Sequence, residues 1–216
     1  MTDSYSTPSA AADRVRVWDP LQRIFHWSLV AAFAVAWLSA EELDSLHEIA
    51  GYVVAALVAF RLIWGLVGSH YARFAQFVTG PRATLAYLGA MVGGRERRYL
   101  GHNPAGAAMI VVLLLCLSGT AFTGWLLDEP DRMAMLPALP VLVAPAHADE
   151  DGDGYGEGEE AGDLIGEAHE VLASLTLLLV ALHVAGVVLA SVRHHENLSR
   201  AMINGEKRAP GPGDIA

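Results

Sequence analysis

Apolar runs with few charged residues, separated by polar connections, dominate the chain, and four of them are long enough to cross a bilayer. They cover roughly residues 21–40, 48–68, 104–127 and 168–192. A helix needs about 20 apolar residues to span a hydrocarbon core about 30 Å thick. The chain is 53% hydrophobic and has a mean hydropathy of +0.35, which is too apolar for an ordinary soluble domain. The pattern predicts an all-α membrane protein, a bundle of four transmembrane helices.

Basic residues predict how these helices are oriented. They cluster before the first run, between the second and third, and after the fourth: Arg14, Arg16, Arg23, Arg73, Arg82, Arg95, Arg97, Arg98, Arg193, Arg200, Lys207 and Arg208. The connections between the first and second runs and between the third and fourth runs are acidic, and Arg132 is their one basic residue. By the positive-inside rule, both termini face the cytoplasm. The net charge of −10 comes mostly from the opposite side, so we expect contact with the lipid bilayer and no nucleic acid.

We expect one membrane domain, residues 17–208, between an N-terminal tail, residues 1–16, and a C-terminal tail, residues 209–216. The connection at about 128–167 is too long for a simple turn, and its second half is acidic. Acids recur there at the spacing of a twelve-residue calcium loop, which makes candidate calcium ligands of Asp149, Asp151, Asp153 and Glu160. The composition favours the alternative, a solvated acidic segment.

Four of the nine histidines lie at membrane depth. His169 and His183 are fourteen residues apart in the fourth run. At about 100° and 1.5 Å per residue, they share one helix face and lie about 21 Å apart along the axis. An imidazole inside a membrane is a functional hypothesis by default. By depth, His47 pairs with His169 on the outer side, and His26 pairs with His183 on the cytoplasmic side.

Two neutral imidazoles can fill both axial positions of a haem iron. Cys116 is the only cysteine, which excludes covalent attachment through Cys-x-x-Cys-His and a cysteine-ligated iron–sulfur cluster. The pattern therefore predicts two non-covalent haems b, their iron ligands being His26, His47, His169 and His183. Zinc is an alternative that fits less well, because structural zinc prefers four close ligands. A capping or interfacial role for a single histidine is another.

Arg61 supports the haem prediction. It interrupts the apolar second run fourteen residues after His47, so it lies on the same face at the depth of the inner pair. A charge at this depth is costly unless it is paired, and a guanidinium can bind a haem propionate through two hydrogen bonds. Extension of the side chain to the cytoplasmic interface is the alternative.

The motifs around these residues resemble those of a known family. In chain order they are FHW in the first run, HEIAGY and RLIWGLVGSHYARF in and after the second, GHNPAGA before the third, and EAHEVLA, LHVAGV and HHENLSRAMINGEKR in and after the fourth. Together they resemble the bacterial cytochrome b-561 / nickel-iron hydrogenase b-type cytochrome family over about residues 17–208. The resemblance implies that the four histidines match the family's haem ligands. The acid- and glycine-rich stretch at 149–163 departs from the family pattern and leaves the partner open.

The resemblance also implies a function, electron transfer in the bacterial inner membrane. Electrons would pass through the two haems between the membrane quinone pool and a periplasmic redox partner, a c-type cytochrome or a hydrogenase-like subunit. A stand-alone oxidoreductase, such as a superoxide:quinone or ferric reductase, is the alternative, and a haem-free protein whose histidines relay protons is a third hypothesis. We expect a subunit rather than an independent enzyme, because acidic outer connections repel the superoxide anion.

Overall fold

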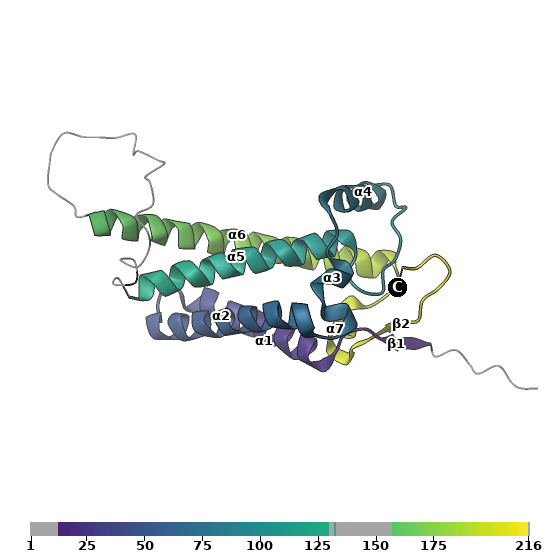
Figure 1. The fold of residues 1–216 in the computed structure, drawn as a ribbon, viewed down its shortest axis with the longest axis horizontal. Helices are drawn as coiled ribbons and strands as arrows, with labels where there is room; N and C mark the ends of the chain where they lie inside the picture. Colours follow the sequence, from purple (N-terminus) through teal and green to yellow (C-terminus); the bar gives the residue numbers. More distant parts are fainter. Residues whose placement is uncertain (1–12, 130–131, 133–156, 216) are drawn as a thin grey trace, which may run out of the picture. The chain divides into compact units, whose positions relative to one another are not determined.

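The structure is a computed structural model that describes residues 13–129, 132 and 157–215 (Figure 1). Its elements are, in chain order, β1 (Arg14–Arg16), α1 (Pro20–Ser39), α2 (Asp44–Val67), η1 (His70–Ala72), α3 (Phe74–Phe77), α4 (Pro81–Val92), α5 (Pro104–Asp128), α6 (Glu157–Arg193), α7 (Leu198–Asn204) and β2 (Glu206–Arg208). The chain divides into two compact units. The first unit takes Met1–Phe25, Ile63–Met109 and His183–Ala216, and the second takes His26–Leu62 and Ile110–Leu182.

Four helices are long and apolar enough to cross a membrane, as the apolar runs predict. They are Pro20–Ser39, Asp44–Val67, Pro104–Asp128 and Ala161–Arg193. The third of these begins at Pro104, whose missing N–H costs nothing in the first turn of a helix. The side chain of Asn103 accepts the N–H of Gly106 at 2.8 Å and caps this end. The chain is therefore a mostly helical, multi-pass membrane protein.

Within α2 and α6, one face is buried and the rest is exposed. The buried residues of α2 recur at intervals of three or four: Ala50, Val54, Val58, Arg61 and Gly65. Ile63, on another face, is 62% exposed. In α6, Thr176 is 0% exposed, whereas Leu178 and Val188 are each 57% exposed. Large apolar side chains with such high exposure are typical of helices whose outer faces contact lipid instead of water.

α6 is longer than its hydropathy predicts. It begins at Glu157, not near residue 168, so the acidic connection expected at 128–167 ends earlier. Hydropathy marks only where a helix becomes apolar; the hydrogen-bonded backbone extends beyond that point through glutamate and alanine, which favour helix, and acids suit its N-terminal end. The calcium candidates Asp149, Asp151 and Asp153 lie outside the described residues. For Glu160 only the backbone, in the first turn of α6, is described.

Both ends of the chain take part in the first unit. β1 and β2 form an antiparallel pair in which Val15 lies opposite Lys207. The carbonyl of Gly205, just before β2, accepts the N–H groups of Val17 and Trp18 at 2.9 and 3.1 Å. Gly205 has a φ of 86°, and a Cβ there would lie 2.6 Å from the carbonyl oxygen of Trp18, so only glycine fits. The sequence pattern did not predict this sheet, because its strands lie at opposite ends of the chain.

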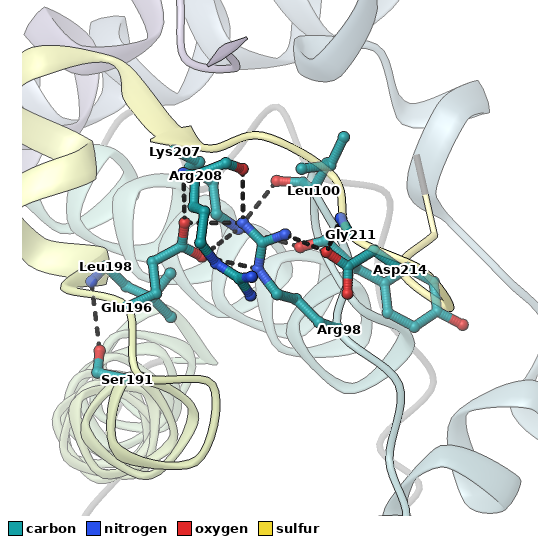
Figure 2. A network of polar contacts seen from close by, with 10 residues as sticks. Arg98, Leu100, Ser191, Glu196, Leu198, Lys207, Arg208, Gly211 and Asp214 are labelled. Carbon is teal, nitrogen blue, oxygen red and sulfur yellow. Dashed lines mark hydrogen bonds and ion pairs between the residues drawn. The ribbon is translucent and has the colours of Figure 1, made fainter. Parts of the chain in front are cut away.

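Buried charges connect the segment before α5 to the end of the chain (Figure 2). Arg98 binds Glu196 at 2.8 Å and Asp214 at 2.5 Å, and Lys207 lies 3.5 Å from Glu196. The side chains of Arg98 and Lys207 are each 4% exposed, and that of Glu196 is 7% exposed. Asp214 belongs to the segment expected to be a tail, and the network holds it against Arg98.

This network lowers the pKa of both carboxyl groups. Burial alone would raise the pKa of Glu196, but the hydrogen bond from Arg98 and the charge of Lys207 outweigh burial and hold that pKa below its usual value of 4.5. The N–H of Gly211 and the Arg98 guanidinium likewise lower the pKa of Asp214 against the effect of burial. Each carboxylate therefore contributes stability that is complete above its unfolded-state pKa and is lost as the pH falls through its folded-state pKa.

We expect the substitution Glu196→Gln to lower the free energy of unfolding at neutral pH by about 3 kcal/mol, since it breaks a buried ion pair. It should also flatten the loss of stability as the pH falls below the usual pKa of glutamate. Denaturant unfolding in detergent over this pH range measures both effects. Glu206→Gln is the matched control, because Glu206 lies in β2 beside the network and its carboxylate is not one of the two that pair with Arg98 and Lys207. Equal stabilities of the two variants would contradict the expectation.

Candidate functional site

The second unit brings two of the four candidate histidines together. His47 lies in the first turns of α2, and His169 lies in α6. Their ring centres are 6.1 Å apart, and their ring planes are inclined at 74°. Both histidines are half-buried. Two imidazoles from different helices thus lie close together, although they are 122 positions apart in the sequence.

Hydrogen bonds fix which ring nitrogen of each histidine remains available. Nδ1 of His47 lies 2.8 Å from the carbonyl oxygen of Ala36, and because a carbonyl can only accept, Nδ1 must carry the hydrogen. Nδ1 of His169 lies 3.0 Å from Oγ1 of Thr123. That hydroxyl donates its own hydrogen to backbone carbonyls one turn earlier, so it accepts from His169. In both rings Nε2 is left with a free lone pair, the form that binds a metal.

Two glycines of α5 let α6 approach it closely, and only one of them touches the histidine. A Cβ on Gly119 would lie 3.0 Å from Cδ1 of Leu172, the end of a flexible side chain. A Cβ on Gly124 would lie 3.1 Å from Cε1 of His169. Since the imidazole is also held by Thr123, it has little freedom to yield. Close helix packing explains Gly119, and room for the ring explains Gly124.

Arg61 lies inside the protein, as its position in the apolar run requires. It is 1% exposed and belongs to α2 of the second unit, fourteen residues after His47. The sequence left open the alternative that the Arg61 side chain extends to the cytoplasmic interface. The structure instead buries its guanidinium. A buried guanidinium requires hydrogen bonds and a counter-charge.

The other expected pair divides between the two units. His26 lies in α1 and belongs to the second unit, and His183 lies in α6 and belongs to the first. Both are half-buried. The pairing of His26 with His183 stays a prediction.

Thr123 is a site residue that the sequence pattern did not single out. It contacts His169 across the α5–α6 interface, 46 residues away, so no local spacing reveals the contact. The one signal in the sequence is the hydroxyl-bearing stretch SGTAFTGW within an otherwise apolar helix.

A family model described as prokaryotic cytochrome b561 matches residues 17–205. The chain belongs to the prokaryotic cytochrome b561 family. This confirms the resemblance seen in the sequence, and the match includes all four candidate histidines and Arg61. Comparison with the curated proteins finds no match, and comparison with the solved structures finds none either. As a member of this family, the chain is a membrane b-type cytochrome that transfers electrons and binds b-type haem.

The His47–His169 pair fits the haem of a cytochrome b561. An imidazole nitrogen binds a metal at about 2 Å and the ring centre lies about 1 Å behind it, so two axial imidazoles have centres about 6 Å apart. The observed separation is 6.1 Å. Among the described residues, His, Cys, Asp and Glu side chains form no group of three or more that could hold a metal ion. A pair of imidazoles is a donor set that can hold a haem iron.

We expect Gly124→Ala to weaken haem binding by this cytochrome b561, because the new methyl group presses on the His169 ring. The reduced-minus-oxidised b-type absorbance per protein, measured after purification, should fall by up to about half if one of two haems is lost. Gly119→Ala is the matched control, since its methyl group meets only the tip of Leu172. Full absorbance in both variants would show that the space beside His169 is not needed.

Proposed function

We propose that this cytochrome b561 transfers electrons across the bacterial inner membrane, between a periplasmic redox partner and the quinone pool, through two haems b that are each held by two histidines. The observation that carries the proposal is the His47–His169 pair, with its 6.1 Å separation and both Nδ1 atoms engaged. Bound haem supplies a one-electron Fe(III)/Fe(II) couple. Two histidine ligands leave no coordination position for oxygen or substrate, which favours electron transfer over chemistry at the iron.

His26 and His183 form the second ligand pair in this proposal. His169 and His183 are both on α6, and fourteen residues correspond to a rise of about 21 Å, enough to place two sites at different membrane depths. Thr176 lies seven residues from each of these histidines and is 0% exposed. Seven residues are close to two helical turns, so Thr176 lies on the α6 face that carries both histidines, and that face is buried at Thr176.

Charge supports a cationic or basic partner at the periplasmic side. We place the α1–α2 turn and the start of α6 on that side by the positive-inside rule. The exposed acids of these two segments are Glu41, Glu42, Asp44, Glu48, Asp163, Glu167 and Glu170. Such a surface steers a basic redox protein toward the haem and repels superoxide, which disfavours the stand-alone superoxide oxidoreductase.

Single histidine variants test the ligand assignment. We expect His47→Ala and His169→Ala to abolish the same one of two haem transitions in a spectroscopic redox titration, and His26→Ala and His183→Ala to abolish the other. His195→Ala is the control, because His195 is exposed and lies beyond the end of α6. If His47→Ala and His183→Ala removed the same transition, the pairing would be wrong. Purified protein without any b-type absorbance after dithionite reduction would contradict the proposal as a whole.

Arg61 has a separate role in the proposal, as the counter-charge of a propionate of the inner haem. Removing a buried charge partner of a bound group weakens its binding strongly. We expect Arg61→Gln to lower the content of the haem that depends on His183 and to leave the haem that depends on His169 in place. The redox titration used for the histidine variants separates the two. Arg200→Gln, at an exposed position of α7, is the control, and equal haem contents in the two variants would remove Arg61 from the site.

A further inference from the structure

The two histidines of the second unit are held by different kinds of partner. His47 donates its Nδ1–H to a backbone carbonyl, that of Ala36. His169 donates its Nδ1–H to the side-chain hydroxyl of Thr123, and the backbone carbonyl of Thr120 also interacts with the His169 ring. A carbonyl partner is fixed by the fold of α1, whereas a hydroxyl partner depends on one residue. The environment of His169 is therefore the one that a single substitution can change.

The geometry around Thr123 holds its hydroxyl in one orientation. Oγ1 lies 2.9 Å from the carbonyl oxygen of Gly119 and 3.0 Å from that of Thr120. These carbonyls take the hydroxyl hydrogen, and the lone pairs of Oγ1 face Nδ1 of His169 at 3.0 Å. The contact lies between two transmembrane helices, where water does not compete with it. The ring cannot turn away easily, because Gly124 brings the α5 backbone against its Cε1 edge.

We propose that Thr123 is a positioning residue that sets the reduction potential of the haem bound by His47 and His169; this inference rests on the proposed function. A partner that accepts the Nδ1–H of a ligating histidine raises the basicity of the other ring nitrogen. A more basic ligand stabilises Fe(III) relative to Fe(II) and so lowers the potential. Thr123 also fixes the tautomer in which Nε2 faces the iron.

Two variants of Thr123 test this role, one that keeps the shape of threonine and one that keeps its hydroxyl. Thr123→Val keeps the volume and removes the acceptor, and Thr123→Ser keeps the hydroxyl. Loss of such a partner changes metal binding by about tenfold or more, and a tenfold change in a one-electron equilibrium corresponds to about 59 mV. We expect Thr123→Val to raise the midpoint potential of one haem transition, the one that His169→Ala abolishes, by about this amount. Thr123→Ser should restore the wild-type value, and the other transition should not move.

Thr120→Val is the matched control on the same helix. Its hydroxyl donates to the carbonyl of Cys116 at 2.9 Å, so the substitution removes a comparable hydroxyl without removing the acceptor for His169. We expect both midpoint potentials of this variant to equal those of the wild type. A shift equal to that of Thr123→Val would mean that any lost hydroxyl of α5 has the same effect, and would overturn the proposal.

The failure of this inference and that of the proposed function are distinguishable. Unchanged potentials in Thr123→Val, with both haems present, would overturn the role of Thr123 and leave the ligand assignment intact. If Thr123→Val lost the haem altogether, Thr123→Cys would decide, because a thiol is a weaker acceptor than a hydroxyl and should give a smaller rise in the same transition. A wild-type potential in Thr123→Cys would then overturn the proposal.

Discussion

An imidazole inside a membrane bundle needs a partner for each of its nitrogens, because no water is present to supply one. The site of the second unit follows from this constraint. The carbonyl of Ala36 and the hydroxyl of Thr123 each accept one Nδ1–H. Each Nε2 keeps a lone pair that can bind a metal, and the separation of 6.1 Å between the ring centres is compatible with one. The helices α1, α2, α5 and α6 each contribute a residue to this arrangement.

Buried charge imposes the same demand elsewhere in the chain. In the first unit, Arg98 and Lys207 are compensated by Glu196 and Asp214, all within hydrogen-bond or ion-pair distance. In the second unit, Arg61 is buried as deeply, and the proposed function assigns its guanidinium to a haem propionate.

Apolar runs in the sequence predicted the four membrane helices. The fourteen-residue spacings placed His47 and Arg61 on one face of α2, and His169 and His183 on one face of α6. These features depend on local periodicity, which a single sequence displays. The early start of α6 was missed because hydropathy does not detect a helix outside the membrane. The β1–β2 sheet and the Thr123–His169 contact were missed because each joins segments far apart in sequence. Only the fold brings such segments together.

The stoichiometry and ligation of haem in the purified wild-type protein test the central claim most directly. Quantification of haem b per chain, combined with the low-spin spectrum of the oxidised protein, measures both. We expect two haems b per chain, each with two histidine ligands. One haem per chain, or a five-coordinate iron with an open position, would contradict it.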